Sequence, residues 1–230
     1  FLFKKKNVIF IGSKSIVLND NQAKTKFQKE LKVGNSKLLI TNEVKVDINK
    51  VNKIINFTFT NLDQKVFFTE GVLDGWKINL FNFFSNENFK TVSFSSSKEI
   101  NGCLNFYDLK IINSTIKVKN SYCEDAINFV RVEGKLDNIE VHGAYSDAVD
   151  FDFSTVEIEN LKIENALNDC LDFSFGKYFV NKSYLSNCGD KAISIGETSE
   201  VRLNYIDVKN SNISVAIKDS SNVIVDKLIN

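Results

Sequence analysis

Carboxylate side chains recur at a fixed interval in the second half of the chain. Asp125, Asp147 and Asp169 lie 22 residues apart, and Asp150 and Asp172 repeat the same interval. Two carboxyl groups held about 5 Å apart repel each other, so the pKa of one of them rises. A protonated carboxyl group beside an ionised one can serve as the acid and the base, or nucleophile, of glycoside hydrolysis. Clustered carboxylate oxygens are also typical Ca²⁺ ligands, so a Ca²⁺ site is the alternative chemistry.

These acids belong to a phrase that is repeated along the chain. The phrase consists of a small residue, an apolar residue, a polar residue and then Phe or Ile, with Asp219 as the exception in the last copy. Its copies begin at Cys103, Ala126, Ala148, Cys170, Ala192 and Ala216. A period of roughly 20–50 residues indicates a repeat architecture. Alternation of apolar and polar residues is typical of a strand with one buried face.

Two further strand patterns follow the phrase in each repeat, for example Val156/Ile158 and then Leu161/Ile163. Three short strands per repeat, without helical periodicity, predict an all-β fold: a parallel β-helix with coils of about 22 residues. Each strand would pair with its counterpart in the next coil, about 4.8 Å away. Residues that tolerate a left-handed backbone follow the third strand and predict a sharp turn. They are Asn120, Gly143, Asn165, Asn187 and Asn210.

The repeat pattern divides the chain without separating it into domains. We expect residues 1–230 to form a single β-helix domain, with an N-terminal cap and irregular coils in 1–70 and regular coils in 71–230. The segment 22–32 predicts a short amphipathic helix that covers the open end of the coils. Residues 85–90 are expected to loop out. The chain lacks an initiator Met and stops within a coil at Asn230, which predicts a piece of a longer protein with other domains.

Composition excludes several classes of partner. The formal net charge is +0, so the electrostatic footprint of a nucleic-acid-binding protein is not expected. No apolar run approaches the roughly 18 residues of a membrane helix, so no membrane span is expected. The 20 Phe residues suit stacked aromatic columns inside a coil. No cofactor is expected.

Four cysteines form two similar pairs. Cys103 and Cys170 each open the first strand of a coil, and Cys123 and Cys188 each lie in the turn before the next first strand. This places the members of each pair in adjacent coils within disulfide reach, so we predict the pairs Cys103–Cys123 and Cys170–Cys188. Disulfides indicate an oxidising compartment: extracellular, periplasmic or cell-surface. The alternative is four buried free thiols in a cytosolic protein. The spacing does not match a zinc site, and no metal ligands are assigned.

Four segments occur in an order and spacing that resembles the polygalacturonase-type glycoside hydrolases, which are right-handed parallel β-helices of the pectin-lyase-like superfamily. The segments are SDAVDF (146–151), NDCLDF (168–173), NCGDKAISIG (187–196) and SVAIKD (214–219). The resemblance covers roughly residues 145–220. It implies that Asp147 and Asp169 activate the attacking water. It also implies that Lys218 contacts substrate.

The chain departs from this family at three positions. Asn168 occupies the place of the general acid, Lys191 stands where a His is expected, and Ala216 replaces a substrate-binding Arg. If the protein cleaves a polymer, Asp172 or Lys191 would have to supply the proton. The candidate residues are therefore catalytic Asp147, Asp169 and Asp172, and substrate-binding Asp150, Asn168, Lys191 and Lys218.

Two functions from different classes remain open. In the first, a polysaccharide, acidic or neutral, binds along the Asp-bearing sheet face and is cleaved if the carboxyl groups are active; Lys191 and Lys218 would pair with acidic sugars. In the second, the coils form a structural or adhesive spacer of a larger envelope protein, and each Asp only makes a turn hydrogen bond. The near absence of long loops after residue 102, which active β-helix enzymes use as groove walls, favours binding or structure over catalysis.

Overall fold

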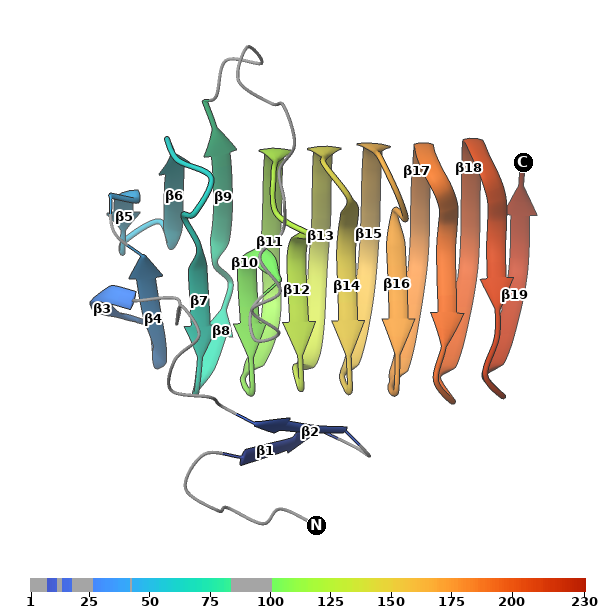
Figure 1. Ribbon diagram of the computed structural model, residues 1–230, viewed down its shortest axis with the longest axis horizontal. Helices are drawn as coiled ribbons and strands as arrows, with labels where there is room; N and C mark the ends of the chain where they lie inside the picture. Colours follow the sequence, from blue (N-terminus) through green and yellow to red (C-terminus); the bar gives the residue numbers. More distant parts are fainter. Residues whose placement is uncertain (1–7, 12–13, 18–26, 42, 84–100) are drawn as a thin grey trace.

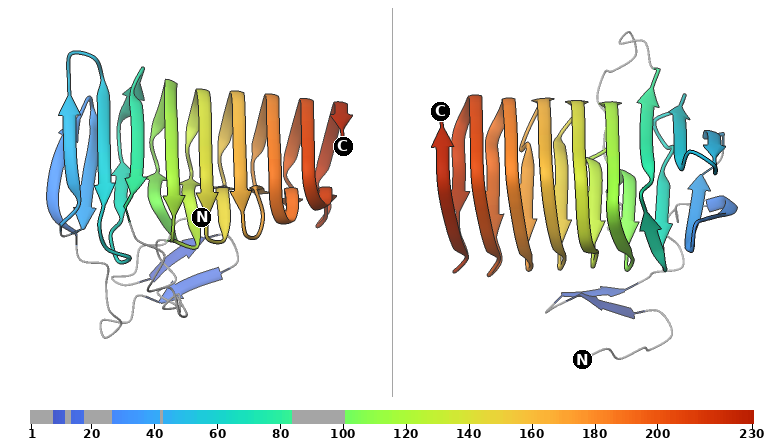
Figure 2. Two further views of the ribbon diagram at one scale, coloured as in Figure 1. Left: turned by 90° about the horizontal axis from the view of Figure 1, so that it is seen from above. Right: turned by 180° about the vertical axis from the view of Figure 1, so that it is seen from behind.

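The chain folds as a parallel β-solenoid of about seven turns (Figure 1). The computed structural model describes residues 8–11, 14–17, 27–41, 43–83 and 101–230. Within these ranges every regular element is a strand, and no helix is long and apolar enough to cross a membrane. Two further views show the coils stacked side by side along one axis (Figure 2). The predicted fold class is confirmed.

Each regular coil contains a short first strand and a long second strand. The first strands are β10 (Gly102–Tyr107), β12 (Asp125–Val130), β14 (Asp147–Asp152) and β16 (Leu171–Ser174). The long strands are β11 (Lys110–Ser121), β13 (Glu133–Ala144) and β15 (Thr155–Ala166). Near the C-terminus, long and first strands merge into continuous strands. These are β17 (Lys177–Gly196) and β18 (Glu200–Ile217), followed by β19 (Asn222–Ile229).

The prediction of three separate strands per coil is therefore wrong in one detail. The second and third predicted strands form one continuous strand of 12 residues in β11, β13 and β15. In β15, Ile158 and Leu161 are buried, whereas Glu159 and Asn160 between them both point outward. Two successive outward residues bend the strand, and the ladder to the neighbouring coils continues on both sides of the bend.

Equivalent side chains of successive coils stack inside the solenoid. Phe129 pairs in register with Phe151, and Phe151 with Phe173. Ring centroids along this column are 4.8 Å apart for Phe106 and Phe129, 4.3 Å for Phe129 and Phe151, and 5.5 Å for Phe151 and Phe173. All four rings have 0% exposure. The predicted Phe column is confirmed, and it forms the centre of the apolar core.

The corner near the end of β11, β13 and β15, and the equivalent corner within β17 and β18, adopts the expected left-handed backbone. The residues in this column have φ values of 58° at Asn120, 86° at Gly143, 65° at Asn165, 56° at Asn187 and 56° at Asn210. Neighbouring amides also bond to each other. Asn187 Nδ2 donates to Asn165 Oδ1 at 2.8 Å, and Asn210 Nδ2 donates to Asn187 Oδ1 at 3.0 Å. Asn thus serves both the turn geometry and the bonding between coils.

Both predicted disulfides are present. Cys103 and Cys123 have Cα atoms 5.3 Å apart, and Cys170 and Cys188 have Cα atoms 5.5 Å apart. Each bond links the start of a first strand to the corner before the following first strand. The cysteines are nearly fully buried, so the disulfides lie at the edge of the core. Disulfides of this kind persist in oxidising surroundings.

The N-terminal part is less regular. Its strands are β3 (Phe27–Val33), β4 (Ser36–Thr41), β5 (Lys45–Asn49), β6 (Ile54–Phe59), β7 (Val66–Thr69), β8 (Val72–Asp74) and β9 (Lys77–Asn82). β3 pairs antiparallel with β4, and β5 pairs antiparallel with β6. Parallel pairing to later coils starts with β6 to β9 and β7 to β10. Separately, β1 (Val8–Ile11) and β2 (Lys14–Val17) form an antiparallel pair.

The predicted helix over 22–32 is wrong for its described part, because Phe27–Val33 is strand β3. Leu31 and Val33 alternate toward the core, and Leu31 lies opposite Leu38 of β4. Pairing with an existing strand outweighs the i, i+4 apolar spacing, which is a weak local preference. Residues 22–26 and the expected loop 85–90 lie outside the described residues.

The Phe column yields the first testable prediction. Phe151→Ala removes a buried ring that contacts an aromatic neighbour in the coil on each side, so we expect the free energy of unfolding to fall by about 3–5 kcal/mol. Phe151→Leu should lose less, and it provides a measurable variant if the Ala variant does not fold. Phe83→Ala is the control, because Phe83 is 72% exposed. Urea unfolding measures the differences; equal losses at 151 and 83 would contradict the stacked core.

Candidate functional site

The first acid column lies where each first strand begins. Asp125 of β12 pairs in register with Asp147 of β14, and Asp169 occupies the same place one coil later, just before β16. The structure therefore brings these acids together as the repeat predicts. Asp125 and Asp169 are buried, and Asp147 is partly exposed.

Two carboxylates of this column, Asp147 and Asp169, bond to the backbone of the following coil. Asp147 Oδ1 accepts hydrogen bonds from the backbone N–H of Asp169 at 2.8 Å and from Asn168 Nδ2 at 2.7 Å. Asp169 Oδ1 accepts from the backbone N–H of Lys191 at 3.0 Å, and Lys191 Nζ lies 3.3 Å from it. Lys191 also pairs with Asp190. Both residues that the resemblance assigns to water activation thus hold successive coils together.

The second acid column points outward three positions further along the first strands. Asp150 pairs with Asn128 of the preceding coil and Asp172 of the next. Asn128 Nδ2 donates to Asp150 Oδ2 at 2.9 Å and also contacts Asp125 Oδ2 at 3.4 Å. One amide therefore bridges the two acid columns.

Electrostatics keep this cluster prone to protonation. Burial, reinforced by the charges of Asp147 and Glu124, raises the pKa of Asp125 well above its usual range, and the Asn128 amide offsets part of the effect. Burial, followed by the charge of Asp125, raises the pKa of Asp150 in the same direction. Both effects disfavour the charged form, because the buried carboxylates lose solvation and repel one another.

The pKa values of Asp147 and Asp172 are also raised, but neighbouring groups offset more of the effect. Burial raises the pKa of Asp147, and the hydrogen bonds from the Asp169 backbone and Asn168 oppose this. Burial raises the pKa of Asp172, whereas the charge of Lys218 and the Ser194 hydroxyl lower it.

The register of β18 corrects the last copy of the predicted phrase. Ala216, not Lys218, pairs with Ser194, which itself pairs with Asp172. The copy therefore begins at Ser214 rather than Ala216, and Lys218 lies two residues beyond the second acid column.

The acid columns are also the place where the sequence allows a cation to bind. Across the described ranges, no group of three or more His, Cys, Asp or Glu side chains is arranged to hold a metal ion. Binding of Ca²⁺ at the Asp cluster stays a prediction.

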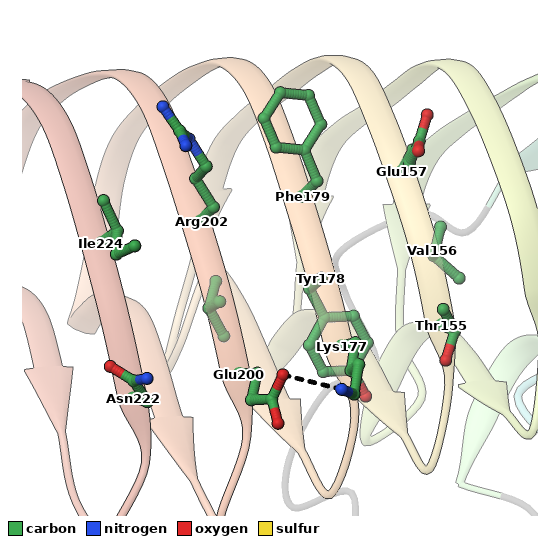
Figure 3. Close-up of a pocket in the computed structure, with 11 residues that line it drawn as sticks. Thr155, Val156, Glu157, Lys177, Tyr178, Phe179, Glu200, Arg202, Asn222 and Ile224 are labelled. Atoms are coloured by element: carbon green, nitrogen blue, oxygen red, sulfur yellow. Dashed lines mark ion pairs between the residues drawn. The ribbon is translucent and has the colours of Figure 1, made fainter.

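A hollow that the sequence did not predict lies on the outer face of the long strands. It measures about 360 Å³ and is lined by residues of β15, β17, β18 and β19. Figure 3 shows Glu157, Phe179 and Arg202 on three successive strands, with the Lys177–Glu200 ion pair below them at 2.9 Å. Phe179 is only partly buried, although its neighbours Tyr178 and Val180 in the strand are core residues.

A second hollow of about 390 Å³ lies further along the same strands, past their bend. In register across its floor lie Lys182, Tyr205 and Lys227. The Tyr184 and Tyr205 rings are 5.8 Å apart, and Lys227 Nζ lies 5.3 Å from the centre of the Tyr205 ring. Asn181 and Asn204 complete the lining. These are outward positions of the repeat, so scanning the polar column of each strand for aromatic residues would have found them.

Comparison with protein-family models, with curated protein sequences and with solved structures found no match for this chain.

The acid cluster yields a pH prediction. A carboxyl group whose pKa is raised by folding binds more protons in the folded than in the unfolded state, so its stability contribution falls as pH rises above the unfolded pKa of about 3.9. Asp150→Asn places an amide in the same column as Asn105 and Asn128. The variant has no carboxyl group at this position, so it does not lose stability in this way as the pH rises. We expect little difference from wild type near pH 4, and a gain of about 1–2 kcal/mol near pH 8.

Urea unfolding at several pH values measures this gain. Asp108→Asn is the matched control, because it removes an exposed carboxylate outside the cluster. Its expected effect on stability is below about 0.5 kcal/mol. A gain for Asp150→Asn that is equal at both ends of the pH range would contradict a raised pKa at Asp150 in the folded protein.

Proposed function

We propose that this chain is an extracellular or cell-surface β-solenoid module that binds an acidic polysaccharide without cleaving it. The observation that carries the proposal is the outward column Lys182, Tyr205 and Lys227, with Tyr184 beside it. Aromatic rings offer flat apolar surfaces to sugar rings, and a few polar groups around them fix the orientation of a ligand. The column runs along the solenoid axis across β17, β18 and β19, which suits an extended chain.

Charge favours an acidic polymer. Lys182 and Lys227 have no carboxylate partner in the described part of the chain, whereas Lys177 and Arg202 nearby are paired with Glu200 and Asp226. Asp207, next to Tyr184 in register, reduces the positive charge without cancelling it. The amides of Asn181 and Asn204, joined at 3.0 Å, retain further capacity to bond hydroxyl groups.

Binding without cleavage follows from the acid columns. Asn168, in the place of the general acid of polygalacturonase-type enzymes, has no carboxyl proton to donate. The carboxylates of Asp147 and Asp169 accept backbone hydrogen bonds, and Asp169 is neutralised by Lys191. Hydrolysis needs one free acid and one free base at the scissile bond. The resemblance to pectin-lyase-like proteins supports the ligand class, and the disulfides support the oxidising location.

Tyr205→Ala tests the binding face. The measurement is affinity electrophoresis in gels that contain neutral or uronic-acid polymers. We expect acidic polymers to retard the wild-type protein. The substitution should lower the affinity for these polymers about tenfold, because a central aromatic anchor is lost. Phe175→Ala is the control: Phe175 is 42% exposed but lies on a turn outside both hollows. No retardation by any polymer would refute the proposal. A loss caused by Asp147→Asn with Asp169→Asn, and not by Tyr205→Ala, would place the ligand on the Asp-bearing face instead.

A rigid spacer is the second candidate function, favoured by the bonds that run from coil to coil through Asp147, Asp169 and the Asn column. In a spacer these side chains serve stability alone.

Asp169→Ala and Asp169→Asn distinguish a structural from a chemical role. The Ala variant leaves the partly buried Lys191 backbone N–H without its Asp169 acceptor and should lose about 1–3 kcal/mol of unfolding free energy. The Asn variant keeps an acceptor oxygen and should lose less. Thermal and urea unfolding provide the measurement; two variants as stable as wild type would show that this ladder is not structural.

A further inference from the structure

The largest of the hollows described lies near the N-terminal end of the solenoid, far along the chain from the aromatic column of β17 to β19. It measures about 620 Å³, within the range of small-ligand sites. Residues from three turns surround it: Gly34 and Asn35 between β3 and β4, Lys50 and Lys53 between β5 and β6, and Asp74 at the end of β8. These turns connect the irregular strands, which Figure 1 shows at the blue to teal end.

The wall of this hollow is positively charged. Lys32, Lys50 and Lys53 line it, against a single carboxylate, Asp74. Lys53 Nζ donates to the backbone oxygen of Asp74 at 2.9 Å and lies 3.9 Å from its carboxylate. Lys32 and Lys50 have no ion-pair partner within the described ranges and are exposed. The ammonium groups of Lys32 and Lys50 are therefore available to a ligand. The ammonium group of Lys53 is held in place by its hydrogen bond to Asp74.

An indole ring forms another part of the wall. Trp76, the only Trp of the chain, is 5% exposed and lines the hollow. The Gly34 turn, with φ 59°, passes so close that a Cβ there would lie 3.3 Å from indole Nε1. Among the described residues, the indole N–H has no protein acceptor. The hydrogen bond that Trp76 donates comes from its backbone N–H and goes to Ser114 Oγ. A donor without an acceptor thus lies beside the lysines.

We infer that this hollow binds an oxyanion, a phosphate or sulfate group, through Lys32, Lys50, Lys53 and the Trp76 indole N–H. Ammonium groups are strong charge-assisted donors to such oxygens, and the indole adds a neutral donor. The site uses other residues and another end of the solenoid than the proposed polysaccharide face, so each can fail without the other. The oxyanion is either a free ion or a group carried by a sugar polymer.

Fluorescence of the single Trp reports binding directly. We titrate the intact chain with inorganic phosphate and inorganic sulfate at constant ionic strength, with chloride as the reference. The expected result is a saturable change in emission for phosphate or sulfate and none for chloride. The Lys32→Ala, Lys50→Ala double variant should raise the half-saturation concentration about tenfold, because two charge-assisted donors are lost.

Two controls keep the result interpretable. Lys209→Ala removes an exposed lysine from another face and should leave the titration unchanged. Circular dichroism of each variant verifies folding. Titration with dextran sulfate and neutral dextran separates the two sources of the oxyanion. If dextran sulfate saturates the site at a lower sulfate concentration than inorganic sulfate does, the ligand is a group carried by a polymer. If inorganic sulfate saturates it at the lower concentration, the ligand is a free ion. No saturable change with any oxyanion, or an equal change in the double variant, overturns the proposal.

Discussion

Parallel stacking of coils of one common length is the constraint on which the rest of the structure depends. Each side chain has an equivalent about 4.8 Å above and below it. Apolar rings gain from this arrangement, and the Phe106 to Phe173 column is stacked at 4.3–5.5 Å. Amides gain as well, because Asn donates to one neighbour and accepts from the other. The same rule makes a column of identical charges unfavourable.

The acid columns show how the chain accommodates that conflict. A backbone N–H of the next coil neutralises part of the charge on Asp147 and on Asp169, and Lys191 ends the first column. In the second column Asn128 separates Asp125 from Asp150 and bonds to both. Protonation at raised pKa values relieves the remaining repulsion. The spacing of this cluster resembles that of a catalytic site, but most of its carboxylates are already hydrogen-bonded to neighbouring coils.

We expect ligand binding where polar and charged side chains lack a partner in the neighbouring coil. On β17 to β19 the outward column alternates Lys, Tyr and Lys, so the ammonium groups meet a ring rather than an opposite charge. At the N-terminal end the antiparallel hairpins break the regular stack, and their turns enclose a hollow. There Lys32, Lys50 and the Trp76 indole N–H have no partner among the described residues. Both surfaces arise from departures from strict repetition.

The sequence alone determined the coil period, the inward Phe column, the left-handed Asn turns and both cystine pairs, because each depends only on which residues recur every 22 positions. Tertiary structure decided what periodicity does not encode. Leu31 and Val33 belong to a strand because β4 offers a partner edge, and Ile158 and Leu161 share one bent strand because both neighbours continue the ladder. The partners of Asp147 and Asp169, and the hollows, depend on side-chain positions in adjacent coils, which are defined only once the coils are stacked.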